Sequence, residues 1–291
     1  MGYNDREDRI QVFNDTMKWC KNNTSLKEAV RNSVASQRVY LEGEEIIPIT
    51  EAIKYDKDAN IIVSKKRSFE AASAYGGQKV ALLNFASATN PGGGVERGSS
   101  AQEECLCRCS TLYPCISTGD VRGLFHSRHK TMLSTGEMNA LYNDDCVYTP
   151  GVVVFKTDTS MPLTMHEDEW YTVDVISCAA PNLRPKPSNS MNPGSGYQPI
   201  KIKNSELRQL HAKRTGRVLD IAKAHGAEVV ILGAFGCGAF QNPPETVAAG
   251  IYEAVKLHIR DFSTIEFAVF CTPRDTANYD AFRRQFEGFA I

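Results

Sequence analysis

Seven residues separate three consecutive glycines, Gly92–Gly94, from the tripeptide Gln102-Glu103-Glu104. Glycine lets a backbone come very close to a ligand, because no Cβ intervenes. Two neighbouring carboxylates are suited to general acid–base chemistry, in which a side chain gives or takes a proton at the reacting bond. Together these residues indicate an enzyme that binds an anionic substrate through the glycines and cleaves a bond next to the bound anion.

A second glycine-rich segment, Ala234–Asn242, lies far along the chain and contains Gly236 and Gly238. Each glycine segment follows a short apolar run and precedes a helical pattern. In an open α/β sheet such loops lie at the same edge, where successive N–H groups and helix N-termini attract anions. Two loops facing each other would hold a diphosphate from both sides. Neither is a Walker A motif, because Gly-Lys-Ser/Thr is missing.

Each of these features also has a purely structural alternative. The second glycine segment is consistent with a tight strand-to-helix turn that binds nothing. In that case Phe235 and Phe240 would be exposed unless they pack against other groups. Glu103 and Glu104 would complement the dipole of the helix that they start. Adjacent helical residues point about 100° apart, so the two carboxylates need not share one task.

The apolar patterning predicts alternating strands and helices, which is typical of a three-layer α/β/α fold. The predicted strands are residues 46–49, 61–64, 79–85, 151–155, 173–180, 228–233 and 265–271. The predicted helices are residues 6–40 in two parts (the second around 26–41), 69–75, 101–112, 205–224, 243–259 and 279–289. Asn204 is the expected N-cap of the helix over 205–224. The segment 183–203, rich in Pro, Ser, Gly and Asn, is expected to be a mobile loop.

We predict two parts of the chain from this order of elements. Residues 1–68 form an N-terminal helical extension packed on the core, and residues 69–291 form the α/β core domain. The extension carries no motif that indicates a role.

Composition and charge exclude several functional classes. A net charge of −1, from 33 basic and 34 acidic residues, argues against a nucleic-acid binder held by bulk electrostatics. The first residues are polar and lack the apolar run of a secretory signal, and no apolar run reaches the length of a membrane span. We therefore expect an intracellular protein, cytoplasmic or nuclear, that is neither secreted nor bound to a membrane.

The nine cysteines indicate reduced thiols rather than a disulfide framework, because their number is odd and they are widely spread. Cys105, Cys107 and Cys109 alternate along a predicted helix, where alternate residues point to different sides, so they do not converge on a metal. His126 and His129 lack carboxylate or cysteine partners nearby. The sequence predicts neither a metal site nor a cofactor.

Four motifs together resemble the signature of the bacterial-type poly(ADP-ribose) glycohydrolases, a branch of the macrodomain fold. The motifs are Asn90–Val95, Ala101–Glu104, Ser177–Asn182 and Gly233–Pro244. The resemblance covers most of residues 69–290, and the triple glycine with Gln-Glu-Glu is its most specific part. It implies a macrodomain-like mixed sheet, a role in the DNA damage response, and a glycohydrolase that cleaves the ribose–ribose bonds of poly(ADP-ribose).

The resemblance also implies roles for individual residues. Glu104 takes the place of the catalytic glutamate, Glu103 that of a neighbour that fixes a ribose hydroxyl, and Asn90 that of a contact to the distal ribose. Gly92–Gly94 would bring the diphosphate against the scissile ribose. The remaining expected substrate contacts are Gln102, Gly236, Cys237, Gly238, Ala239 and Phe240, with Phe240 near the terminal ribose. The adenine pocket is not assigned.

Other functions stay open on the sequence alone. A hydrolase of mono-ADP-ribose on protein, nucleic acid or a small molecule would use the same loops and acid. A non-catalytic ADP-ribose reader would have no need of Glu104, and an unrelated nucleotide-binding domain would match both motifs by coincidence. The expected partner is poly(ADP-ribose) or an ADP-ribosylated macromolecule. We expect the protein to be a monomer that does not bind nucleic acid directly. Exo or endo cutting is undetermined.

Overall fold

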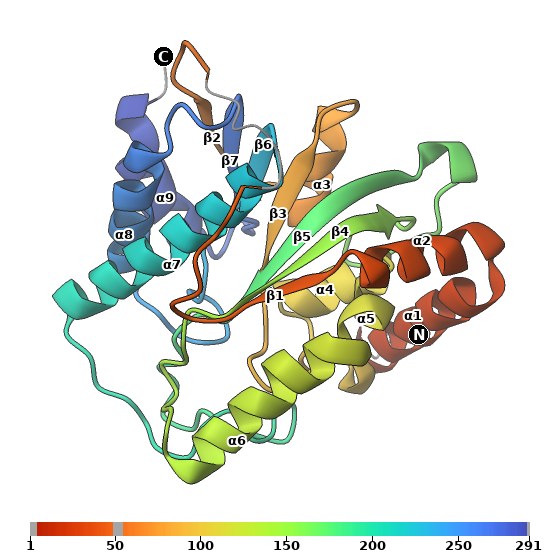
Figure 1. Cartoon of the computed structure of the whole chain (residues 1–291), viewed down its shortest axis with the longest axis horizontal. Coiled ribbons are helices and arrows are strands. Elements are labelled where there is room, and N and C mark those ends of the chain that lie inside the picture. The colour runs from red at the N-terminus through yellow and green to blue at the C-terminus, as the bar shows by residue number, and fades with distance from the viewer. Residues whose placement is uncertain (1–4, 49–54, 290–291) are drawn as a thin grey trace.

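The computed structural model of the chain describes residues 5–48 and 55–289. Within these residues seven strands form one sheet, in the order β1-β4-β5-β3-β6-β7-β2, with helices on both faces (Figure 1). The strands are β1 (Arg38–Tyr40), β2 (Asn60–Ser64), β3 (Val80–Phe85), β4 (Cys146–Val154), β5 (Tyr171–Cys178), β6 (Val229–Leu232) and β7 (Thr264–Ala268). The α-helices are α1 (Asp5–Asn22), α2 (Thr24–Ala35), α3 (Ser68–Ala72), α4 (Gln102–Cys109), α5 (Leu112–Ile116), α6 (Arg128–Thr135), α7 (Asn204–Ala224), α8 (Pro244–Leu257) and α9 (Ala277–Phe286).

The central strand β3 is apolar on both sides because helices cover both faces of the sheet. Val80 and Leu82 pack into the core on one face, whereas Ala81 and Leu83 pack into the core on the other. β3 pairs in parallel with β5 and β6, while β4 runs antiparallel to β1 and β5. This mixed sheet between two helical layers confirms the predicted three-layer α/β/α architecture.

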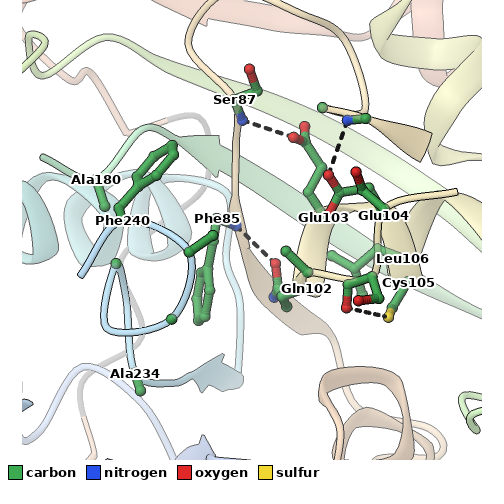
Figure 2. Close-up of a pocket in the computed structure, with 18 of the residues that line it drawn as sticks. Phe85, Ser87, Gln102, Glu103, Glu104, Cys105, Leu106, Ala180, Ala234 and Phe240 are labelled. Atoms are coloured by element: carbon green, nitrogen blue, oxygen red, sulfur yellow. Dashed lines mark hydrogen bonds between the residues drawn. The ribbon is translucent and has the colours of Figure 1, made fainter. Parts of the chain in front are cut away.

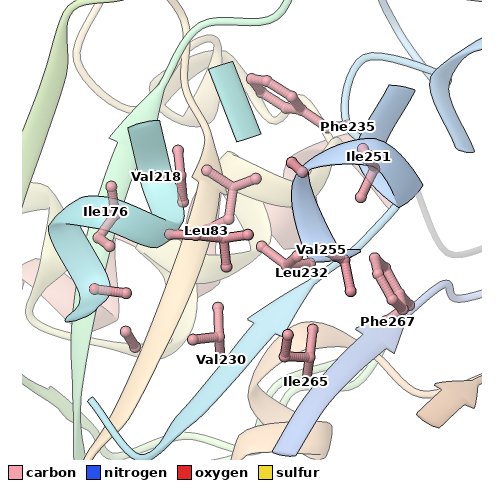
Figure 3. Close-up of a cluster of buried hydrophobic side chains, with 14 of the residues drawn as sticks. Leu83, Ile176, Val218, Val230, Leu232, Phe235, Ile251, Val255, Ile265 and Phe267 are labelled. Carbon is pink, nitrogen blue, oxygen red and sulfur yellow. The ribbon is translucent and has the colours of Figure 1, made fainter. Parts of the chain in front are cut away.

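One core lies between the sheet and the layer formed by α7, α8 and α9. Figure 3 shows Val230 and Ile265 of the sheet facing Val218 of α7 and Ile251 and Val255 of α8. All five side chains are buried. Burial of each such side chain contributes roughly 1.5–3 kcal/mol of transfer free energy, so this layer anchors β6, the strand that the second glycine segment follows.

The opposite core joins the sheet to α1, α3, α4 and α5. Phe13, Phe69, Leu106 and Leu112 are the buried side chains that these four helices contribute, in that order. α1 therefore packs into the same core as α4, the helix that begins with the Gln-Glu-Glu tripeptide.

The helical prediction over residues 6–40 is wrong at its end. α2 stops at Ala35, and Arg38–Tyr40 form β1, an edge strand paired antiparallel with β4. Tyr40 is fully buried in the core beside α7, so its side chain packs as part of the sheet and not of a helix face. Residues 46–48 form no strand, and Ile49 of the predicted strand 46–49 lies outside the described residues.

Several further boundaries differ from the sequence prediction. The predicted helix 101–112 is divided, because Ser110 leaves the helix and bridges to Val154 of β4. α5, a π-helical segment over Val121–Ser127 and α6 are absent from the prediction, since α5 is only five residues long and contains a proline, and the other two are short and show weak helical periodicity. β4 begins earlier than residue 151 and β7 ends before residue 271. The N-cap of α7 is Lys203 and not Asn204, and its backbone N–H donates to the Glu206 carboxylate at 3.3 Å.

Residues 1–68 contribute strands as well as helices. β1 and β2 both lie in this segment, and they form the two opposite edges of the sheet. The segment therefore forms part of the central sheet at both of its edges. The division of the chain at residue 68 stays a prediction.

Candidate active site

A cavity of about 610 Å³ opens where β3, β5, β6 and β7 reach their carboxyl ends. Figure 2 shows the glutamates of α4 on one side of it and the second glycine segment on the other. Glycines of both predicted segments belong to the lining of this one cavity. The predicted site residues that line the cavity are Gly93, Gly94, Gln102, Glu103, Glu104, Gly236, Gly238, Ala239 and Phe240. Asn90, Gly92 and Cys237 lie outside its lining.

The carboxylate of Glu103 is buried and held by two donors. The backbone N–H of Ser87 donates to Oε2 at 2.7 Å, and the side-chain amide of Asn84 donates to Oε1 at 3.3 Å (Figure 2 draws the former). Burial, and then the negative charge of Glu104, raise the pKa of the Glu103 carboxyl well above its ordinary value. Both oxygens are engaged by the protein, which suits a residue that positions other groups.

The carboxyl group of Glu104 is also buried but only half engaged. The backbone N–H of Gly94 donates to Oε1 at 2.9 Å. Oε2 has no hydrogen-bond partner among the described residues. Burial raises the pKa of Glu104, and the hydrogen bond from Gly94 opposes that rise. A carboxyl with one bare oxygen and a raised pKa is suited to carry a proton to a departing oxygen.

The first glycine segment needs its glycines even before a ligand arrives. Gly92 and Gly93 have φ values of 64° and 59°, in the left-handed region that residues with a Cβ rarely adopt. A Cβ on Gly93 would lie 2.5 Å from Oε1 of Glu104, and a Cβ on Gly94 would lie 2.3 Å from Oγ of Ser99. The lack of side chains at Gly93 and Gly94 thus allows the carboxyl group of Glu104 to contact the backbone of this segment.

The second glycine segment combines one constrained glycine with one free glycine. Gly236 has a φ of 84°, and a Cβ there would lie 2.7 Å from the Cβ of Ala180. The buried side chain of Asn242 donates to the Gly236 carbonyl at 3.0 Å and contacts Nε2 of His211 at 3.0 Å through its oxygen. A Cβ on Gly238 would meet nothing within 4 Å. Gly238 is therefore the glycine whose exposed backbone faces the cavity.

The two phenylalanines of this segment pack against protein groups. Phe235 is fully buried, with its ring centroid 5.5 Å from that of Phe85. Phe240 is partly buried, with its centroid 6.2 Å from the ring of Tyr142. Phe235 therefore anchors the second glycine segment to the core, while Phe240 lines the cavity.

Two predicted substrate contacts have their polar groups engaged within the protein. Gln102 accepts from the N–H of Phe85 at 2.9 Å and donates to the carbonyl of Leu83 at 2.8 Å, which fixes the start of α4 against β3. The side-chain amide of Asn90 donates to Oδ1 of Asn192 at 2.7 Å. Both residues hold neighbouring segments in place.

The sequence reasoning missed one wall of the cavity. The guanidinium of Arg67 lies 4.0 Å from the ring centroid of Phe270, and both residues line the cavity. They follow β2 and β7, which pair in parallel, so residues far apart in the chain meet at the same edge. No motif marks either residue, although the position of Arg67 just beyond a predicted strand was an available signal.

The 183–203 segment forms another wall of the cavity. It contains no helix or strand, as predicted. However, Oγ of Ser87 donates to Oδ1 of Asn192 at 2.8 Å, and the hydroxyl of Tyr142 donates to the buried Ser195 carbonyl at 2.7 Å. The first bond ties the segment to the residues just before the triple glycine, and the second ties it to the residues just before β4. The expected mobility of the segment stays a prediction. Its residues in the cavity lining are Arg184, Asn189, Met191 and Asn192.

Thiols and histidines in the described residues form no metal site. All nine cysteines are free, as predicted. Across residues 5–48 and 55–289, no three potential metal-binding side chains gather as a site. In the same ranges the model has no helix with both the length and the apolar character for crossing a membrane.

The chain is similar to a known protein family and to several solved structures. A family model described as the catalytic domain of microbial-type PARG, poly(ADP-ribose) glycohydrolase, matches residues 8–157. No curated protein matches the chain. The crystal structure of poly(ADP-ribose) glycohydrolase from Thermomonospora curvata is 27% identical, with a TM-score of 0.78, over 97% of this chain and 100% of that one.

Two ligand-bound crystal structures are similar as well. The Thermomonospora curvata enzyme bound to the inhibitor ADP-HPD is 28% identical, with a TM-score of 0.74, over 97% of this chain and 100% of that one. The Deinococcus radiodurans poly(ADP-ribose) glycohydrolase in complex with ADP-ribose is 27% identical, with a TM-score of 0.68, over 90% of this chain and 98% of that one.

Proposed function

The chain belongs to the microbial-type PARG family of glycosidases, and we propose that it releases ADP-ribose by cleaving the ribose–ribose O-glycosidic bonds of poly(ADP-ribose). Similar proteins bind ADP-ribose and the inhibitor ADP-HPD. The cavity between α4 and the second glycine segment is the place where this chain would hold the same kind of molecule.

The observation that carries this proposal is the half-engaged carboxyl of Glu104. Its Oε1 is fixed by the N–H of Gly94, while its Oε2 has no partner within the described part of the chain. A fixed carboxyl at the wall of a cavity, with a pKa raised by burial, can be protonated and still be correctly aimed. A binding module has no use for such a group.

The reaction follows from the chemistry of the glycosidic bond. Protonated Glu104 donates its proton to the departing ribose oxygen as the bond breaks through an oxocarbenium-like state. The neighbouring diphosphate of the substrate stabilises the positive charge on the ribose. Glu104, now a carboxylate, takes a proton from the water that attacks the positively charged ribose carbon. Glu104 is thereby protonated again, as it was at the start of the reaction.

The other residues hold the substrate in this proposal. The N–H groups of Gly93 and Gly94 already donate to the carbonyl of Asn90 and to Glu104, so these two glycines admit the diphosphate on one side because they have no side chain. Backbone N–H groups of Gly238 and Ala239 meet the diphosphate from the other side. Glu103, fixed by two donors, accepts from a ribose hydroxyl. No metal or cofactor enters any of these steps.

The test is direct incubation of the purified protein with two substrates. One is poly(ADP-ribose), the other is a mono-ADP-ribosylated protein, and free ADP-ribose is measured in each. Release from the polymer supports the proposal. Release only from the mono-ADP-ribosylated protein would favour the mono-ADP-ribosyl hydrolase, and ADP-ribose binding without release from either substrate would favour a reader.

A further inference from the structure

Helix α1, which carries no recognisable motif, directly contacts the first glycine segment, taken here as residues 92–99. Three consecutive carbonyls just beyond the triple glycine each accept a hydrogen bond from a different arginine. The three pairs are Arg6 Nε with Arg97 O (2.9 Å), Arg9 Nε with Gly98 O (2.7 Å) and Arg108 Nη1 with Ser99 O (2.6 Å). Two of these arginines come from α1 and the third from α4.

The backbones of α1 and this segment also meet without a side chain between them. Gly98 has a φ of 74°, and a Cβ there would lie 2.5 Å from the carbonyl oxygen of Arg6. A residue other than glycine would push α1 away. The glycine therefore serves the approach of a helix and not that of a substrate.

α1 supports the other end of the segment through an aromatic pair. The ring of Phe13 packs edge-on against that of Tyr113, with centroids 4.9 Å apart. The hydroxyl of Tyr113 donates to Glu96 at 2.6 Å, and a Cβ on Gly92 would lie 2.7 Å from the Tyr113 ring. The helix thus supports the segment at the first of the three glycines, by way of Tyr113, and directly beyond the three glycines.

Hydrogen bonds within the segment connect these supports to the proposed acid. The N–H groups of Arg97 and Ser99 both donate to the carbonyl of Gly94, at 2.9 Å and 3.1 Å. The N–H of Gly94 in turn donates to Glu104. A shift of residues 97–99 would therefore move the peptide groups that hold the carboxyl of Glu104.

We propose that α1 is a positioning element of the active site, in which Arg9 and Arg6, together with Arg108, clamp carbonyls 97–99 and so keep Gly94 aligned with Glu104. This inference rests on the proposed role of Glu104. Hydrogen bonds from guanidinium groups are about twice as strong as those between neutral groups, and misplacement of a catalytic group by about 1 Å can lower a rate roughly 100-fold. Arg6 and Arg9 do not line the cavity, so they act through the segment and not on the substrate.

The test replaces the half-buried Arg9 by alanine. The matched control is Arg31→Ala in α2, because Arg31 is exposed and makes no side-chain hydrogen bond or ion pair within the described residues. We expect Arg9→Ala to lower kcat for polymer cleavage about tenfold, with KM changed less than about threefold. Arg6→Ala changes an exposed side chain, so it tests the same clamp without threatening the fold, and it should lower kcat in the same direction.

Hydrogen exchange separates the clamp from the proposed function. Amides of residues 92–99 should exchange faster in Arg9→Ala than in the wild type, and at the wild-type rate in Arg31→Ala. This readout needs no turnover, so it decides the clamp even if the wild type cleaves no polymer and the proposed function fails. Unchanged exchange in both Arg9→Ala and Arg6→Ala, or an equal loss of kcat in Arg31→Ala, would overturn the inference.

Discussion

Gly94 and Glu104 are joined by a hydrogen bond of 2.9 Å from the backbone amide to the carboxyl oxygen Oε1. The segment expected to grip a diphosphate therefore also holds the acid expected to cleave beside it. In the proposed function, binding and proton transfer are therefore coupled through one peptide group. Substitutions in this segment will change both, and their effects must be separated by measuring affinity and turnover independently.

Glu104→Gln is expected to abolish release of ADP-ribose while keeping its binding. Glutamine retains the shape of the side chain and an oxygen that accepts from Gly94, but it has no proton to donate. We expect kcat to fall by roughly 100-fold or more, the contribution of a general acid, with the Kd for ADP-ribose changed less than about threefold. Turnover assays and calorimetry check the two parts. Glu28→Gln, in an exposed position of α2, is the control, and turnover retained by Glu104→Gln would exclude the assigned role.

Gly93→Ala is expected to lose activity through the acid itself. The new Cβ would lie 2.5 Å from Oε1 of Glu104, and a φ of 59° would strain the alanine. Glu104 must therefore move, so kcat should fall together with ADP-ribose affinity. The kinetics and a calorimetric titration of the same preparation show whether both change. Normal kcat in this variant would mean that the alignment of Gly93 and Glu104 has no catalytic importance.

Gly238→Ala isolates the contribution of the second glycine segment. A Cβ at Gly238 meets nothing within 4 Å and needs no unusual backbone conformation, so the free protein should keep its structure. If the backbone here approaches the diphosphate, the methyl group should weaken ADP-ribose binding at an unchanged Tm. Gly216→Ala in α7, which is equally unobstructed, is the control. Equal affinities for both variants would remove Gly238 from the binding surface.

Acid is expected to destabilise the protein through His211, which supports the second glycine segment by way of Asn242. Burial lowers the pKa of His211 from its ordinary 6.5 to about 4. Between these values the unfolded chain binds a proton that the folded chain does not. The free energy of unfolding should therefore fall as the pH decreases from 6.5 to about 4, by up to about 1.4 kcal/mol per pH unit for this residue.

His211→Gln tests this dependence, because glutamine can still donate to Asn242 and does not titrate. Denaturant unfolding of both proteins between pH 7.5 and pH 4.5 gives the two slopes. The variant should lose less stability on acidification than the wild type. Parallel curves would show that His211 does not titrate differently in the two states.

Local patterns in the chain were sufficient for the architecture and for most of the residues that line the cavity. The apolar run of β3 and the glycines after it predicted a buried strand with a binding loop at its carboxyl end. The pair Glu103 and Glu104 indicated acid–base chemistry. Each of these signals lies within one element and its adjacent loop, where residue spacing reports directly on backbone geometry.

What only the tertiary structure decided are the contacts between elements. Arg67 meets Phe270, Arg9 reaches the carbonyl of Gly98, and the N–H of Gly94 finds Glu104. The periodicity of one element shows which of its faces is buried but not which partner covers that face. The order of strands and the helices packed on them follow from the combined burial of both cores, so the contact of α1 with residues 97–99 could be seen only in the tertiary structure.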